Sequence, residues 1–221
     1  MKSVKQYIYG KNTILEALKG EKTVHCVYLL QKDTQCIEIC RRRRIPVEFV
    51  DKQYFIKVLG NVVHQGIMAS IEEYQYYDVG EILAAIPKGK QPLLLMLDGL
   101  EDTHNLGAIL RTCDAVGVDG VIIGKNRSVS LNGTVAKVST GAIDHIKVAR
   151  VTNLSRTLEE LKEKSFWVIG CDLQQSQDYR KVDYNMPIVI VIGSEGQGIS
   201  RLVNKNCDMH VILPMEGHVT S

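Results

Sequence analysis

The sequence predicts an α/β protein in which a small amino-terminal module precedes a larger domain built on a parallel sheet. Short aliphatic runs alternate with helix-length segments along the whole chain. After residue 92, three glycine-punctuated segments each follow such a run. The 221 residues are 45% hydrophobic, which is enough to bury one core of ordinary size or two small ones.

In the amino-terminal module, segments with helical spacing of apolar residues alternate with short apolar runs. We therefore expect helices and strands to alternate there. Helices are predicted over residues 12–18, 34–43 and 54–59, and strands over 26–30, 47–50 and 67–71. These six elements would complete a compact α/β module.

A breaker cluster at residues 87–92, Pro-Lys-Gly-Lys-Gln-Pro, marks a boundary. We therefore expect a first domain over residues 1–71, a linker over 72–91 and a second domain over 92–221. In the second domain, strands are predicted near residues 93–97, 121–123, 146–149, 166–169, 188–192 and 211–213. The wide intervals leave room for crossover helices, which favours a parallel doubly wound sheet.

Charge is distributed unevenly. Residues 1–71 hold 12 Lys and Arg against 6 Asp and Glu, a balance of +6, whereas residues 72–221 hold 15 against 19, a balance of −4. A basic front part is expected if it meets phosphate. Its densest part is Arg41, Arg42, Arg43 and Arg44. A solvated helix end is the alternative, because arginines also suit the negative end of a helix.

The cysteines do not indicate a metal site. The six of them show no C-x-x-C spacing, so we expect buried or free thiols and no bound metal. Cys36 and Cys40 are spaced to meet on one helical face. No signal peptide, lipidation motif or membrane-length apolar run is present, which predicts a cytoplasmic protein with no membrane partner.

The first glycine-punctuated segment covers residues 97–112. Asn105 is expected to be a helix N-cap, and Gly107 to permit close approach near the helix start. Arg111 falls on the polar side of this helix, where a plain surface arginine is the alternative. A buried face is expected from apolar residues at helical spacing: Leu106, Ile109, Leu110, Cys113 and Val116.

The second segment, residues 193–198, has the order G-x-x-G-x-G and lacks both the dinucleotide fingerprint and a Walker lysine. Its three glycines let backbone approach a ligand closely, and Glu195 lies among them. On the pattern alone, a structural strand-to-helix turn is an alternative. The third segment starts at Leu213, and Met215 follows it on the other side of a proline; buried strand-end residues are the alternative there. All three segments would leave carboxyl ends of strands, where open α/β sheets bind ligands.

Together these segments resemble the SPOUT superfamily of RNA methyltransferases. The closest resemblance is to SpoU/TrmH-type enzymes that methylate ribose 2′-hydroxyls, particularly the RlmB-like group acting on 23S ribosomal RNA. Residues 9–12, Tyr-Gly-Lys-Asn, and 64–66, His-Gln-Gly, resemble the amino-terminal RNA-binding domain of that group. The resemblance implies an L30e-like fold for the first domain and an α/β trefoil knot for the second.

The resemblance also implies S-adenosylmethionine as cofactor, without a metal. It implies the catalytic group Asn105, Arg111 and Glu195. It implies the cofactor-binding residues Gly193, Gly196, Leu213 and Met215, with Ser139 and Gly141 as weaker candidates on the methionine side. For RNA, we expect Lys11 and the four arginines to contribute. We prefer Arg111 as a bidentate donor to a phosphate or the developing alkoxide, with Glu195 or water as the base.

We therefore predict methyl transfer to a ribose 2′-hydroxyl of structured RNA, with 23S ribosomal RNA as the first candidate and transfer RNA as the second, by a homodimer. A noncatalytic RNA-binding protein on the same scaffold is the alternative. Family members continue past the equivalent of Ser221 with Leu-Asn-Val-Ser and a final helix that completes the knot. Either this sequence omits that tail, or the chain is a truncated form, for which we expect an unfinished knot and weak or no cofactor binding.

Overall fold

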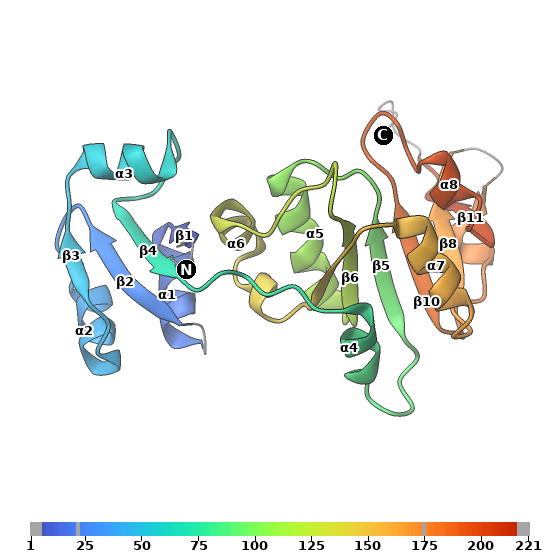
Figure 1. Ribbon diagram of the computed structural model, residues 1–221, viewed down its shortest axis with the longest axis horizontal. Helices are drawn as coiled ribbons and strands as arrows, with labels where there is room; N and C mark the ends of the chain where they lie inside the picture. Colours follow the sequence, from blue (N-terminus) through green and yellow to red (C-terminus); the bar gives the residue numbers. More distant parts are fainter. Residues whose placement is uncertain (1–5, 21–22, 174–175, 216–221) are drawn as a thin grey trace. The chain divides into compact units, whose positions relative to one another are not determined.

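The computed structural model describes residues 6–20, 23–173 and 176–215. Packing divides the chain into two compact units (Figure 1). Unit 1 contains the described residues up to Gln75, together with Thr103–Thr112 and Ser130–His145. Unit 2 contains Tyr76–Asp102, Cys113–Val129 and the described residues from Ile146 onward.

Unit 1 is built on a four-stranded sheet in the order β1-β4-β2-β3. Strand β4 is antiparallel to β1 and β2, and β3 is parallel to β2. The sequence analysis missed β1, a short strand that ends just before Gly10. The strands are β1 (Gln6–Tyr9), β2 (Val24–Leu29), β3 (Val47–Phe49) and β4 (Ile67–Ile71), and the helices among them are α1 (Lys11–Lys19), α2 (Thr34–Arg43) and α3 (Lys52–Leu59).

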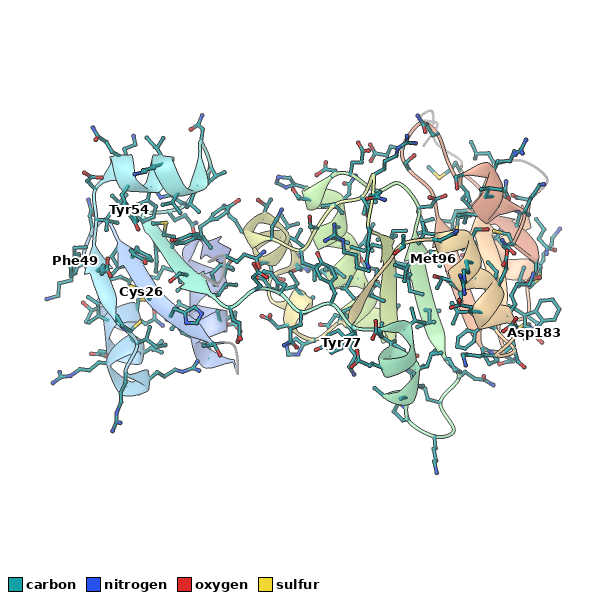
Figure 2. All side chains as sticks on the ribbon, viewed as in Figure 1. Cys26, Phe49, Tyr54, Tyr77, Met96 and Asp183 are labelled. Atoms are coloured by element: carbon teal, nitrogen blue, oxygen red, sulfur yellow. The ribbon has the colours of Figure 1, made fainter. Side chains whose placement is uncertain are left out.

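Local sequence explains the start of α2 and its buried face. The Asp33 carboxylate accepts the Cys36 N–H at 3.1 Å and so caps the helix. Cys36 and Cys40 are fully buried with their sulfurs 3.9 Å apart, which confirms that they share a face. On another side of the unit 1 core, Cys26 and Tyr54 belong to one apolar cluster (Figure 2).

Two glycines bring the rest of unit 1 together. Helix α6 (Gly133–Ser139) packs on β1, and a Cβ on Gly133 would lie 2.2 Å from the Tyr7 carbonyl oxygen. Helix α5 (Thr103–Val116) begins in unit 1, and a Cβ on Gly107 would lie 2.6 Å from the Val138 Cβ. The close approach predicted for Gly107 is thus confirmed, with α6 as its neighbour.

Unit 2 is built on a seven-stranded sheet in the order β7-β6-β5-β10-β8-β11-β9, in which every neighbouring pair is parallel. This confirms the predicted parallel α/β class. The two-residue strand β9 was not predicted, because it is too short to show a pattern. The strands are β5 (Leu93–Leu97), β6 (Gly120–Gly124), β7 (Val148–Val151), β8 (Trp167–Cys171), β9 (Gln177–Asp178), β10 (Ile188–Ile192) and β11 (Met209–Ile212).

The core of unit 2 lies between this sheet and short helices. Met96 of β5 is fully buried in it (Figure 2). The helices are α4 (Val79–Ala84), the later part of α5, α7 (Leu154–Lys162) and α8 (Arg201–Asn204). Helix α4 falls within residues 72–91, predicted to be a linker, and its Ile82 is buried against Gly120. No helix in the described part of the chain is long and apolar enough to cross a membrane.

The trefoil knot stays a prediction. It depends on the chain that follows β11, and residues 216–221 lie outside the described residues.

Candidate functional site

The three glycine-punctuated segments start from one edge of the unit 2 sheet. Strand register aligns Leu97 of β5 with Ile192 of β10, Ile192 with Cys171 of β8, and Cys171 with Val211 of β11. These four residues form a row at or next to the carboxyl ends of their strands, here called the edge row. Parallel sheets bind ligands beyond this edge. The expectation that all three segments leave the same edge is therefore confirmed.

The first two segments are hydrogen-bonded to each other. The Asp98 N–H donates to the Ile192 carbonyl at 2.9 Å, and the Asp98 carboxylate accepts the Ser200 N–H at 2.7 Å. Gly99 has a φ of 74°, and a Cβ there would lie 3.5 Å from the Ser194 Cβ. The loop after β5 is thus fixed against the loop after β10.

Residues 193–198 close on themselves. Ser194 and Gly198 exchange two backbone hydrogen bonds of 2.9 and 3.1 Å. A Cβ on Gly193 would lie 2.0 Å from the Gly198 carbonyl carbon, so Gly193 is required by loop closure itself. Gly196 has a φ of 99° and open space beside its Cα, and Glu195 next to it is exposed. Residues 193–198 therefore form a structural turn, as the alternative predicted, and Glu195 is exposed on it.

The third segment presents apolar surface beyond the edge row. Leu213 is 64% exposed and Met215 is 58% exposed, so the alternative of buried strand-end residues is wrong. Strand β11 ends at Ile212, one residue before this segment, so nothing in the sheet covers these side chains. Ile192, at the end of β10, is also 37% exposed.

Helix α5 departs from the sequence prediction at both ends. It begins at Thr103, so Asn105 is in its first turn and is not the N-cap; Asp102, which precedes the helix, is also a residue type that favours that position. Val116, predicted to be buried, is 62% exposed. Arg111 is exposed, as predicted from its side of the helix. Because Asn105 and Arg111 belong to unit 1 and Glu195 to unit 2, their joint action stays a prediction.

Ser139 and Gly141, the weaker cofactor candidates, lie in unit 1. Ser139 is fully buried, and its hydroxyl donates to the Ala136 carbonyl at 3.2 Å. Its polar group is thus satisfied within its own helix. Gly141 has a φ of 98° and open space beside its Cα, as suits the turn after α6.

Among the predicted RNA-binding residues, Arg43 has a structural role. Its guanidinium donates to the Leu18 and Gly20 carbonyls at 2.6 and 2.9 Å, where α1 ends. The charge therefore stabilises the negative end of the neighbouring helix. Arg41, Arg42 and Arg44 remain exposed.

Lys11 forms an ion pair with Asp33, with 2.8 Å between Nζ and Oδ2. The hydrogen bond from Lys11 and that from the Cys36 N–H hold the pKa of Asp33 below its ordinary value. The ion pair of Lys11 with Asp33 thus connects the start of α1 to the loop before α2.

Cys171 and Asp98 also lie at this edge of the sheet, and neither was predicted from the sequence. Cys171 is exposed as a whole residue in the edge row, while partial shielding of its sulfur from water raises the pKa of the thiol. The only signal for Cys171 was its place directly after an apolar run, and for Asp98 its place directly after a buried strand. The described residues contain no group of three or more His, Cys, Asp or Glu that could hold a metal ion.

Comparison with known families and proteins agrees with this architecture. The SpoU rRNA Methylase family matches residues 92–221, and the RNA 2′-O ribose methyltransferase substrate binding family matches residues 7–77. YacO of Bacillus subtilis, whose name assigns it to the TrmH family of tRNA/rRNA methyltransferases, is 45% identical over 97% of this chain and 88% of its own. A relative in Staphylococcus aureus strain COL with the same family name is 48% identical over the same shares.

Solved structures share the fold. The SpoU methyltransferase AviRb from Streptomyces viridochromogenes, in complex with AdoMet, has a TM-score of 0.79 at 20% identity, over 98% of this chain and 83% of its own. An AdoMet-bound rRNA methyltransferase from Sinorhizobium meliloti has a TM-score of 0.76 at 21% identity, over 98% of this chain and 81% of its own. The family match and the curated relatives thus identify an RNA methyltransferase of the SPOUT class. Within that class, the chain belongs to the SpoU/TrmH family.

Proposed function

We propose that this RNA methyltransferase modifies a ribose 2′-hydroxyl of structured RNA, with ribosomal RNA as its substrate. The observation that carries the proposal is the edge row. It shows that all three glycine-punctuated segments leave the sheet at the same edge. The match of residues 7–77 to a family described as RNA 2′-O ribose methyltransferase substrate binding supports the ribose target.

The cofactor is S-adenosylmethionine, and the edge of unit 2 fits it. Leu213 and Met215 offer exposed apolar surface of the kind that an adenine ring or a thioether chain covers. In the loop after β10, Gly196 leaves open space at its Cα, so backbone can approach a ligand there. We assign Gly193 to loop closure first and to cofactor contact second. The Gly198 backbone already leaves no room for a side chain at position 193, so a cofactor is not needed to explain the glycine.

When bound, the cofactor supplies an electrophilic methyl group on a sulfonium. A bond forms between the methyl carbon and the ribose 2′-oxygen, the carbon–sulfur bond breaks, and the hydroxyl proton passes to a base. Such an in-line transfer depends on positioning the two reactants. The Asp98 N–H donates to the Ile192 carbonyl, and the Asp98 carboxylate accepts the Ser200 N–H. These two hydrogen bonds join the loops after β5 and β10 and give that positioning a rigid support.

We assign Arg111 to hold a phosphate or the developing alkoxide. A guanidinium keeps its proton at neutral pH and offers a planar pair of donors, which suits an orienting role better than proton abstraction. Glu195, exposed at the tip of its loop, or a water molecule takes the proton. Asn105, in the first turn of α5, completes the proposed catalytic group, which acts in a homodimer.

Methylation of purified RNA tests the proposal directly. The protein is incubated with methyl-labelled S-adenosylmethionine and either transcribed 23S ribosomal RNA or unmodified transfer RNA, and the product is hydrolysed in alkali. Because 2′-O-methylation blocks alkaline cleavage at that nucleotide, label is expected in alkali-resistant dinucleotides from ribosomal RNA. Label in mononucleotides would identify a base as the target. Labelling of transfer RNA alone would identify transfer RNA, and not ribosomal RNA, as the substrate. RNA binding without any labelling would favour the noncatalytic alternative.

A further inference from the structure

A cationic surface lies beside the catalytic edge in unit 2. The loop of residues 125–128 follows β6 and carries Lys125 and Arg127, both exposed. Arg150 approaches the same loop from β7, where its Nη2 donates to the Lys125 carbonyl at 3.1 Å. These three cations, here called the β6–β7 cluster, stand out in a part of the chain, residues 72–221, that is acidic as a whole.

In the described part of the chain, no carboxylate is paired with the β6–β7 cluster. Among the residues that the structure describes, no carboxylate lies within 4.0 Å of any of the three charged groups. The Arg150 guanidinium instead lies against the Tyr76 ring, with Cζ 5.4 Å from the ring centroid. A cation–π contact of this kind restrains the guanidinium and leaves its charge available.

Two polar groups at this place lack partners. Arg150 Nε and Ser128 Oγ are buried without a hydrogen bond, and they are two of three such side-chain atoms in the described part of the chain. A buried donor without a partner costs stability, so native proteins rarely keep one unless a ligand or water satisfies it. Both atoms can donate, and an oxyanion would accept from both.

The β6–β7 cluster is joined to the site by backbone hydrogen bonds and by strand register. The Val129 N–H donates to the Leu100 carbonyl at 2.8 Å, which connects the loop to the first glycine-punctuated segment. Register continues the edge row from Leu97 to Ile123 and then to Arg150. With neighbouring strands about 4.8 Å apart, Arg150 is roughly 14 Å from Ile192 along the row. A few nucleotides of RNA cover that span.

We propose that Lys125, Arg127 and Arg150, with Ser128, bind a backbone phosphate of the RNA strand that carries the target ribose. This inference rests on the proposed function and names the surface over which the substrate passes. A phosphodiester matches the cluster because a planar guanidinium and a hydroxyl can both donate to its oxygens. The carboxylate of the cofactor is the other anion at this edge, and the experiment separates the two.

The test compares a Lys125→Ala/Arg127→Ala double variant and Arg150→Lys with the unaltered protein. Lys164→Ala is the matched control, because Lys164 is exposed just before β8 and therefore lies at the opposite, amino-terminal edge of the sheet. RNA affinity for transcribed 23S ribosomal RNA is measured over a range of salt concentrations. Cofactor affinity is measured by calorimetry, and methyl transfer by initial rates.

We expect the double variant to bind RNA about tenfold more weakly for each phosphate interaction that the substitutions remove. The slope of log K against log salt should become shallower by roughly 0.7 for each single-strand phosphate that is no longer neutralised. KM for RNA should rise while kcat and cofactor affinity stay unchanged. Arg150→Lys keeps the charge and should keep most of the salt slope, but it should lower affinity because the planar fork is absent from lysine.

Unchanged RNA affinity and salt slope in the double variant would overturn the proposal, as would an equal reduction in Lys164→Ala. Weakened cofactor binding with normal RNA binding would also overturn it and assign the cluster to the cofactor carboxylate. These binding measurements do not depend on which atom of the RNA is methylated. Failure of the ribose assignment is therefore distinguishable from failure of this site.

Discussion

The Asp98 carboxylate accepts the Ser200 backbone N–H at 2.7 Å and so connects two segments that are 102 positions apart. Ser200 is the N-cap of α8, and its own side chain makes no capping hydrogen bond. Asp98 therefore supplies an acceptor at the start of a helix whose loop carries Glu195. A carboxylate there also complements the positive end of α8.

Replacement of Asp98 should weaken both stability and cofactor binding. Asp98→Ala leaves the Ser200 N–H without its acceptor, and we expect a loss of about 1–2 kcal/mol in the free energy of unfolding. Asp98→Asn retains an acceptor and should lose less. Urea denaturation and calorimetric titration with S-adenosylmethionine measure the two effects; equal values for all three proteins would contradict a connecting role.

Arg111 and Glu195 should matter for the reaction and not for folding. Both side chains are exposed, so Arg111→Ala and Glu195→Ala are expected to keep the melting temperature and to lose most methyl transfer. Arg111→Lys supplies charge without the planar fork and should restore little activity. Full activity of the lysine variant, in single-turnover assays, would refute bidentate orientation by Arg111.

Cys171 should be the thiol that reacts first with iodoacetamide, and S-adenosylmethionine should protect it. It is exposed in the edge row, whereas Cys26, Cys36, Cys40 and Cys113 are buried. Because the thiolate is the reactive form and partial shielding of the sulfur raises the pKa of Cys171, its labelling rate should rise as pH increases from 7 to 9. Peptide mass spectrometry locates the label, and Cys171→Ser is the control. Equal labelling with and without saturating cofactor would contradict our placement of the cofactor.

Gly133→Ala should destabilise unit 1. The added Cβ would lie 2.2 Å from the Tyr7 carbonyl oxygen, and backbone cannot yield as a flexible side chain can. We expect a loss of about 1–3 kcal/mol, as for overpacked cores. Gly80→Ala in α4 is the matched control, since nothing lies within 4 Å of its Cβ position, and it should be neutral or stabilising. Thermal unfolding of both variants distinguishes local crowding from a general effect of alanine.

The Lys11–Asp33 pair should contribute to acid sensitivity. The pKa of Asp33 is lower in the folded protein than in the unfolded chain, where it is about 3.9. Its stabilising contribution is therefore complete above that value and is lost as pH falls through the folded-state pKa. Asp33→Asn should flatten the decline of stability below about pH 4. Denaturation midpoints at pH 3 to 7 measure this, and an unchanged pH profile would contradict it.

Local pattern was enough to predict the alternation of elements and the three glycine-punctuated segments. The uninterrupted aliphatic run that forms β5 depends only on near neighbours in sequence. Cys36 and Cys40 meet because they are four residues apart on a helix. The N-cap of α5 was predicted wrongly, because the pattern favoured Asn105 whereas the helix begins at Thr103.

What the sequence by itself determined is therefore the parallel α/β class, the three glycine-punctuated segments at strand ends and the basic charge of the front part. Only the tertiary structure decided strand order, and with it that Ile192 lies beside Leu97 and Cys171. It also decided that the Arg43 guanidinium donates to backbone carbonyls at the end of α1 and that Val116 is exposed. The physical reason is that register and burial depend on hydrogen bonds and packing between segments far apart in the chain, which no local periodicity encodes.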